Sequence, residues 1–139
     1  MVGSRAARRG RMTYLLDTNT CLDVLLGRSE RVMATMERRA AVIAISAITV
    51  AELRVGNRYS AEPEEDARRV DLFLSAVPSF AFDETAAEAY GRVIRRVGVK
   101  RLSFDRLIAA HAVALGRVMV AGNGGDFADV PGLVVENWR

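Results

Sequence analysis

Residues 14–20, Tyr-Leu-Leu-Asp-Thr-Asn-Thr, form a short apolar run that ends in a carboxylate and three side chains able to cap a helix. The run is typical of a buried strand, and Asp17 is placed to begin a helix that ends near Gly27. A second apolar run, Ala41-Val-Ile-Ala-Ile, has the pattern of a strand covered on both faces. The two runs predict a parallel sheet with helical connections.

Strand and helix patterns alternate along the rest of the chain. We expect helices at residues 29–39, 49–57, 62–76, 83–97 and 103–115, and strands at residues 79–82, 117–121 and 132–136. This order predicts an α/β/α sandwich, in which helices cover both faces of a central, mostly parallel sheet of four to five strands.

Positive charge is concentrated at the start of the chain. The net charge is +3, but residues 1–11 hold four arginines and no acid, which leaves 16 basic and 17 acidic residues from Met12 onward. The nearly neutral remainder gives no general argument for nucleic-acid binding. We expect residues 12–139 to form a single domain, and residues 1–11 to be either a basic, disordered arm or the product of a start assigned too far upstream.

The chain carries the features of a cytoplasmic protein. Cys21 is the only cysteine, so no intramolecular disulfide can form, which fits a reducing compartment. Residues 1–11 contain no hydrophobic segment of the kind found in secretory signals. No apolar run reaches the roughly 18 residues that a membrane span needs, so no membrane association is expected.

Four carboxylates stand at the borders of apolar segments. Asp17 and Asp126 follow predicted strands, Glu52 lies in the helix after the second strand, and Asp105 lies in the first turn of the helix before the fourth strand. Since sites in parallel sheets form beyond the carboxyl ends of the strands, all four can face one edge. Clustered carboxylates repel unless a cation neutralises them, and such oxygen ligands favour Mg²⁺ or Mn²⁺.

Each carboxylate also has a structural explanation. Asp17 can cap a helix, Asp105 gains from a helix dipole beside the capping group of Ser103, and Asp126 suits a glycine-rich turn. Glu52 lies among apolar neighbours and is harder to explain in this way. One metal site accounts for the joint pattern, which otherwise needs four separate explanations.

Other chemistries lack the residues that they require. The sequence has neither a GxGxxG motif after the first strand nor a GxxxxGK[ST] motif. His111 is the only histidine and is expected to be a packed or rim residue, so serine or cysteine triads and a standard structural zinc site are unsupported. A receiver domain phosphorylated on Asp17 needs an acidic pair before Asp17 and a lysine near the last strands, and the chain has neither.

Four segments resemble the PIN-domain ribonucleases, specifically the VapC-type toxins of bacterial toxin–antitoxin pairs. They are Tyr14-Leu-Leu-Asp-Thr-Asn, Ser46-Ala-Ile-Thr-Val-Ala-Glu-Leu, Asp105-Arg-Leu-Ile-Ala-Ala-His-Ala, and Asn123-Gly-Gly-Asp-Phe-Ala-Asp-Val-Pro-Gly-Leu followed by Glu136-Asn-Trp. Each motif is weak alone. Together they occur in the family's order and span nearly all of residues 12–138.

The resemblance implies which residues act. Asp17, Glu52 and Asp105 are then the metal-binding and catalytic acids, with Asp126 as a fourth. Thr18, Asn19 and Asn123 are implied to support the ligands. Relatives usually carry Thr or Ser where this chain has Ala121. The missing hydroxyl implies weaker activity or a poorly formed second metal site.

The resemblance also implies a function. The chain is expected to be a Mg²⁺- or Mn²⁺-dependent endoribonuclease in which a metal-activated water attacks an RNA phosphodiester. The densest basic set, expected to contact RNA, is Arg92, Arg95, Arg96, Lys100, Arg101 and Arg106. The alternative is a catalytically inactive PIN-like module that binds RNA or protein.

Partners are implied in the same way. Family members dimerise, sometimes within a larger toxin–antitoxin assembly, and are silenced by a cognate antitoxin that lays a helix in a groove and places a basic side chain in the acidic site. Leu25, Leu26, Met33 and Met36 are candidates for that groove. Core packing would explain these four side chains equally well.

Overall fold

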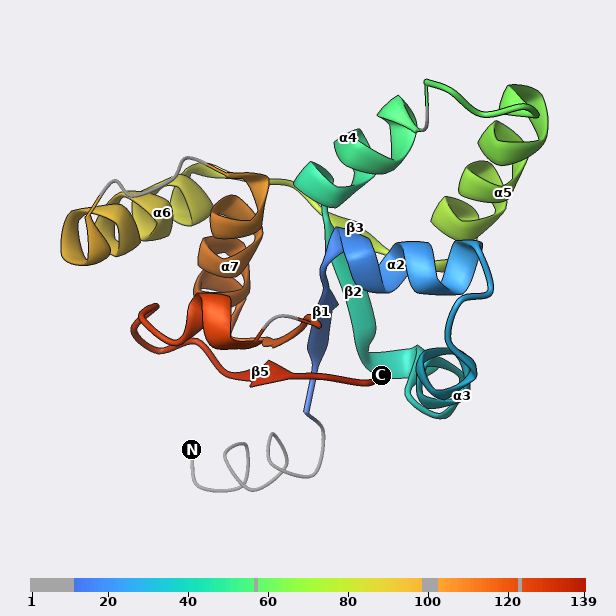
Figure 1. The fold of residues 1–139 in the computed structure, drawn as a ribbon. Helices are drawn as coiled ribbons and strands as arrows, with labels where there is room; N and C mark the ends of the chain where they lie inside the picture. Colours follow the sequence, from blue (N-terminus) through green and yellow to red (C-terminus); the bar gives the residue numbers. More distant parts are fainter. Residues whose placement is uncertain (1–11, 57, 99–102, 123) are drawn as a thin grey trace.

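A five-stranded, entirely parallel sheet forms the centre of the computed structural model, which describes residues 12–56, 58–98, 103–122 and 124–139. Its strands are β1 (Tyr14–Leu16), β2 (Ile43–Ser46), β3 (Ser79–Phe80), β4 (Val118–Val120) and β5 (Val135–Glu136). Their order in the sheet is β3-β2-β1-β4-β5. The predicted α/β fold is confirmed, and β1 is the central strand (Figure 1).

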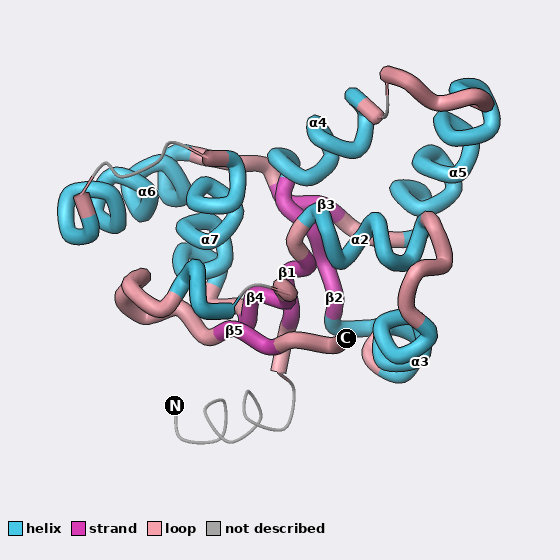
Figure 2. Tube along the Cα trace, viewed as in Figure 1, coloured by secondary structure: helices cyan, strands magenta, loops and turns pink. Residues whose placement is uncertain are grey.

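Six α-helices in the described part of the chain connect and cover the strands (Figure 2). They are α2 (Thr18–Leu25), α3 (Glu30–Arg38), α4 (Ala47–Val55), α5 (Pro63–Ala76), α6 (Glu84–Val97) and α7 (Phe104–Leu115). Two short 3₁₀ helices, η1 (Ala40–Val42) and η2 (Gly124–Phe127), precede β2 and follow β4. The termini of the helices lie within two residues of the sequence prediction.

Alternate side chains of the short strands build two separate cores. Tyr14 and Leu16 of β1 join an apolar cluster with side chains of α2, α3, α4 and α5. Leu15 points to the other face and packs with α6 and α7. Figure 1 shows these two groups of helices on opposite sides of the sheet. Because both faces are covered, every residue of β1, β2 and β4 is buried, as the unbroken apolar runs predicted.

Helix starts follow local capping chemistry. The side chains of Asp17, Asp83 and Ser103 accept hydrogen bonds from backbone N–H groups in the first turns of α2, α6 and α7, and the caps at Asp17 and Ser103 were predicted. The helix predicted from residue 49 begins two residues earlier, because Ser46 caps it through the N–H of Ile48.

Both edge strands are shorter than predicted. Of the predicted residues 79–82, Ala81 and Phe82 lie outside β3, and Asp83 caps α6. The last strand begins only at Val135, after a turn in which Gly132 has a φ of +77°. Trp138, which follows β5, is buried in the first core and packs edge-on against Tyr14, with ring centroids 5.2 Å apart.

No helix among the described residues is long and apolar enough to cross a membrane. The basic segment 1–11 lies outside the residues that the structure describes, so the two interpretations of it stay predictions.

Truncation of the central core tests the packing. Ile45 of β2 has no exposed surface, and we expect Ile45→Ala to lower the free energy of unfolding by about 2–5 kcal/mol because removal of a large buried side chain leaves a cavity. Leu72→Ala is the control, since Leu72 is 66% exposed and its truncation costs little. Urea denaturation at one fixed protein concentration measures both. Equal destabilisation of the two variants would contradict the assignment of the core.

Candidate functional site

The site lies where the strand order of the sheet reverses. From β1 the chain proceeds to β2 and β3 on one side, and β4 and β5 lie on the other. Asp17 directly follows β1, and its backbone N–H donates to the carbonyl of Val120 at the end of β4, with an N···O distance of 2.9 Å. Crevices at such a reversal are the usual ligand sites of open α/β sheets.

Asp17 is held rigidly by the start of α2. The residue is 5% exposed, and one carboxylate oxygen accepts the backbone N–H of Thr20 at 2.8 Å. The Thr20 hydroxyl donates to the Val120 carbonyl at 3.2 Å, so the same turn is tied to β4. The capping explanation of Asp17 is thus confirmed, and the cap fixes this carboxylate at the edge of the sheet.

Glu52 reaches the same edge from the middle of α4. It is half-buried, and the Thr18 hydroxyl lies 2.5 Å from its Oε1. The Thr18 and Thr49 hydroxyls lie 3.2 Å apart. Because Thr18 has a single hydroxyl proton, it donates to Glu52 and accepts from Thr49. Thr18 thus orients Glu52. Asp17, which Thr18 and Asn19 were expected to support, is instead held by Thr20.

Asp105 completes a group of three acids. It lies exposed in the first turn of α7, two residues after the capping Ser103. Its negative charge raises the pKa of both Asp17 and Glu52, although burial is the larger cause for each. Hydrogen bonds from Thr20 and Thr18 oppose these shifts. Three of the four predicted acids therefore act on one another at one edge of the sheet.

These acids are near neighbours without forming a compact ligand set. Among the described residues, no three His, Cys, Asp or Glu side chains lie close enough together to hold a metal ion. Asp126 lies exposed in η2, and its backbone carbonyl accepts from the Arg106 guanidinium at 3.4 Å. Asn123 lies outside the described residues, and Asn19 is exposed beside Asp17 in sequence.

His111 joins the helices that carry Asp105 and Glu52. It is 1% exposed on α7, and its Nδ1 lies 2.8 Å from the Oγ of Ser46, the cap of α4. Burial lowers the pKa of His111, which keeps the ring neutral. The only histidine is thus a buried connector, in agreement with the prediction of a packed residue outside any catalytic triad.

The predicted basic set is only partly described. Arg92, Arg95 and Arg96 lie on α6, whereas Lys100 and Arg101 lie outside the described residues. The Arg106 guanidinium is engaged by Asp129, at 3.0 and 3.3 Å. Arg106 is therefore the least available of the described members.

A groove leads away from Glu52 between α2, α4 and α5. It has a volume of about 260 Å³ and a mostly apolar lining, which includes Thr18 and Glu52. Leu25 and Leu26, two of the four side chains expected to bind a partner, line it. Met33 and Met36 of α3 are not among its lining residues, and Met36 packs against the first core.

Sequence reasoning missed an ion-pair group beside Asp17. Asp23 of α2 is 2% exposed, and its carboxylate accepts from Arg28 at 3.0 Å and from Arg139 at 2.7 and 3.1 Å. The one sequence signal is a carboxylate among the apolar residues of a helix. Nothing in the local sequence identifies Arg139 as its partner.

Known proteins share this architecture. A family model described as "PIN domain" matches residues 14–133. A protein of Salmonella typhimurium named "tRNA(fMet)-specific endonuclease VapC" is 31% identical over 130 residues, covering 91% of this chain and 98% of that protein. "Ribonuclease VapC2" of Rickettsia felis is 33% identical over 132 residues, with the same two coverages.

Solved structures agree with these matches. The DNA-bound VapBC of Salmonella typhimurium contains a chain with a TM-score of 0.84 and 30% identity, matched over 92% of this chain and 99% of that chain. The VapBC2 of Rickettsia felis bound to a DNA fragment from its promoter gives a TM-score of 0.82 and 32% identity, over 92% and 100%. The chain therefore belongs to the PIN-domain family and, within it, to the VapC proteins.

Proposed function

We propose that this protein is the toxin of a VapBC-type toxin–antitoxin pair and acts as a metal-dependent endoribonuclease. The observation that carries the proposal is the group of Asp17, Glu52 and Asp105 at the reversal of the sheet in a VapC-type PIN domain. PIN-domain nucleases depend on divalent metal ions, and the VapC relatives are named as ribonucleases and endonucleases.

The chemistry of these residues fits a hard divalent cation. All the donors are carboxylate oxygens, which Mg²⁺ and Mn²⁺ prefer. Burial and mutual repulsion raise the pKa of Asp17 and Glu52, so the ionised group gains from a nearby cation. We propose Asp17, Glu52 and Asp105 as the ligands, with Asp126 as a fourth and Asn123 and Asn19 as supporting groups.

Neighbouring groups hold the proposed ligands in position for the reaction. When bound, the cation supplies Lewis acidity toward the scissile phosphodiester and lowers the pKa of the attacking water. The Thr20 N–H keeps Asp17 in one orientation, and the Thr18 hydroxyl keeps Glu52 directed at the same edge. His111 and Ser46 hold α7 against α4, so the acids of these helices stay together.

RNA is the proposed substrate, and its backbone needs positive charge next to the acids. We propose that Arg92, Arg95 and Arg96, together with Lys100, Arg101 and Arg106, supply it. We propose a cytoplasmic location for the same reason, and the buried, free Cys21 is consistent with a reducing compartment.

The groove along α2, α4 and α5 is the proposed seat of a cognate antitoxin. The solved VapBC structures are toxin–antitoxin complexes, and the apolar lining suits the apolar face of a helix. A basic side chain carried by that helix would meet Glu52 at the site. A homodimer, alone or within a larger assembly with the antitoxin, stays a prediction.

Removal of a ligand tests the nuclease directly. We expect cleavage of RNA by the purified protein with Mg²⁺ or Mn²⁺, none in a chelator, and none by Asp17→Asn or Asp105→Asn, because each variant lacks an ionised ligand. Glu88→Gln, which removes an exposed carboxylate of α6, is the control and stays active. Metal binding without cleavage would indicate an RNA target missing from the assay. Absence of metal binding by calorimetry would favour an inactive PIN-like module.

The burial of Asp17 and Glu52, together with the repulsion between the acids, predicts an unusual pH dependence without metal. Since the pKa of Asp17 is raised above 3.8 and that of Glu52 above 4.5, the folded state holds these protons more tightly than the unfolded state. Their contribution to stability is therefore greatest at low pH and is lost as pH rises through the raised values.

It follows that Asp17→Asn stabilises the metal-free protein at pH 7. Asn keeps the oxygen that caps α2 but carries no charge, and we expect the melting temperature to rise by a few degrees. The gain shrinks as pH falls toward 4, and added Mg²⁺ reverses it, because only the wild type gains from the ion. Thermal melting of both proteins with and without Mg²⁺ measures this, and destabilisation by the variant at pH 7 is the contrary result.

The basic face of α6 is tested by charge reversal. We expect Arg95→Glu with Arg96→Glu to weaken binding of single-stranded RNA and to lower the slope of log K against log salt by about 0.7 for each phosphate that the protein no longer binds. Fluorescence anisotropy over a salt series measures both quantities. Unchanged binding would remove α6 from the RNA interface.

A further inference from the structure

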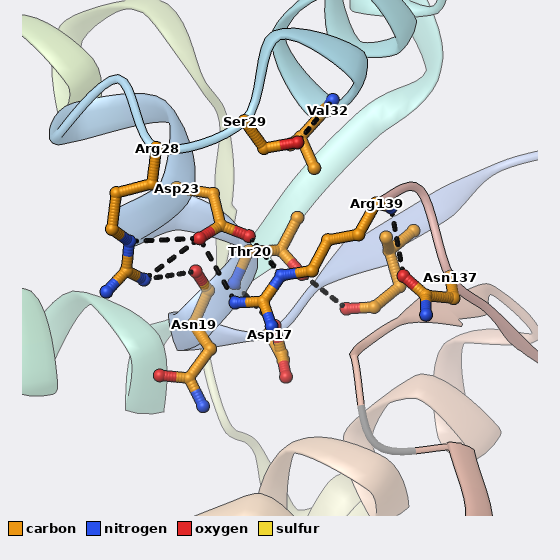
Figure 3. Close-up of polar contacts among 10 residues, drawn as sticks. Asp17, Asn19, Thr20, Asp23, Arg28, Ser29, Val32, Asn137 and Arg139 are labelled. Carbon is orange, nitrogen blue, oxygen red and sulfur yellow. Dashed lines mark hydrogen bonds and ion pairs between the residues drawn. The ribbon is translucent and has the colours of Figure 1, made fainter.

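We propose that Arg139 and Arg28, both held on the buried carboxylate of Asp23, form a binding site for an RNA backbone phosphate beside the acidic site. This inference rests on the proposed ribonuclease function and extends it to residues outside the predicted basic set. Figure 3 shows the Arg139 guanidinium between Asp23, to which dashed lines join it, and Asp17.

Asp23 makes the pair of arginines rigid. The residue is 2% exposed, and its carboxylate receives three side-chain hydrogen bonds, from the Nε of Arg28 and from the Nε and Nη2 of Arg139. The backbone N–H of Arg28 also donates to the Asp23 carbonyl at 2.8 Å, after the turn at Gly27. A guanidinium that is already immobilised loses little further entropy when it binds a phosphate.

The charge of this group is incompletely neutralised. One carboxylate faces two guanidinium groups, so the side chains of Asp23, Arg28 and Arg139 together carry a charge of +1. The side chains of Arg28 and Arg139 are still 44% and 48% exposed, so an anion in solution can reach them. Within the described residues, the Nη1 atom of Arg139 has no hydrogen-bond partner and remains available as a donor.

The Arg139 guanidinium lies close to Gly122. The Nη1 atom would lie 3.1 Å, and the Cζ atom 3.4 Å, from a Cβ placed on Gly122. The guanidinium therefore rests directly on the backbone of the loop that follows β4 and precedes Asp126. Because the Asp17 N–H is bonded to Val120 in the same region, Arg139 stands at the rim of the acidic site, and its charge acts on Asp17.

This arrangement suits a phosphodiester that flanks the scissile bond. The acids at the centre repel RNA phosphates, whereas a fixed cation at the rim can hold a neighbouring phosphate by charge-assisted hydrogen bonds. Arg106 is less suited to that part, because its side chain is only 16% exposed, against 48% for that of Arg139. A structural tether between α2 and the segment after β5 is the competing explanation, and it predicts no effect on RNA binding in a folded variant.

The decisive variant is Arg139→Gln in Asp105→Asn protein, which leaves the RNA uncut. The probe is a fluorescein-labelled, single-stranded RNA of about 20 nucleotides and mixed sequence, and affinity is measured over a salt series with Mg²⁺. We expect about tenfold weaker binding and a salt slope lower by about 0.7, as for the removal of one phosphate interaction. Arg68→Gln, whose guanidinium pairs with Glu65 on α5, is the matched control and changes neither quantity.

A second variant keeps the charge and moves the guanidinium. Gly122→Ala has no adverse φ, but its Cβ would displace the Arg139 guanidinium by a few tenths of an ångström. We expect weaker RNA binding with an unchanged salt slope, whereas Gly91→Ala, which meets nothing within 4 Å, is neutral. Arg139→Lys should recover the salt slope that Arg139→Gln loses, because the positive charge is kept. It should recover only part of the lost affinity, since an ammonium group is a point charge and lacks the planar fork of the guanidinium.

The outcomes separate this inference from the proposed function. Arg139→Gln protein that melts like its parent and binds RNA with the same affinity and slope overturns the phosphate site and leaves the nuclease intact. If the parent protein binds no RNA and the wild type cuts none with metal, the proposed function fails and the phosphate site fails with it. In cleaving protein, the expected signature is a raised KM with a smaller change in kcat.

Discussion

The hydrogen bond from the Asp17 amide to the Val120 carbonyl joins the two halves of the sheet at its carboxyl edge. The last paired residues of β1 and β4 are Leu16 and Val120, and this bond extends the pairing by one residue, to Asp17. The same residue turns its carboxylate to the Thr20 N–H and begins α2. Strand pairing, helix capping and the placement of the acid thus depend on one backbone conformation, and the position of the other acids is defined relative to it.

Two buried carboxylates, Asp23 of α2 and its cap Asp17, show how environment distinguishes a structural acid from one that we propose to bind a metal ion. Asp23 is surrounded by two guanidinium groups, which compensate its charge. Asp17 is almost as deeply buried but has the hydrogen bonds of Thr20, two acidic neighbours, and the charge of Arg139, whose guanidinium is already paired with Asp23; its pKa is raised. A charge left without compensation inside a stable fold costs free energy, which is recovered only when a cation or a basic partner binds.

Local patterns predicted those parts of the fold that local chemistry controls. The buried runs of β1 and β2, the caps at Asp17 and Ser103 and the grouping of Asp17, Glu52 and Asp105 follow from residues a few positions apart, combined with the rule that parallel strands share an edge. The contact of Thr18 with Glu52 and that of Asp23 with Arg139 span 34 and 116 residues. Contacts at such separations depend on the assembled sheet, and no spacing in a single sequence encodes them.

The all-parallel pairing also determines when, during synthesis, the site can form. Residues 14–16 pair with residues 118–120, so the central strand waits for a partner made about 100 residues later, which at the usual rate of synthesis takes roughly 5–20 s. A nascent chain that stops before residue 118 already contains Asp17, Glu52 and Asp105. It lacks the Val120 carbonyl that accepts the Asp17 N–H, and it lacks Arg139, which pairs with Asp23. The proposed site of RNA cleavage therefore assembles only after residues 118–120 have left the ribosome.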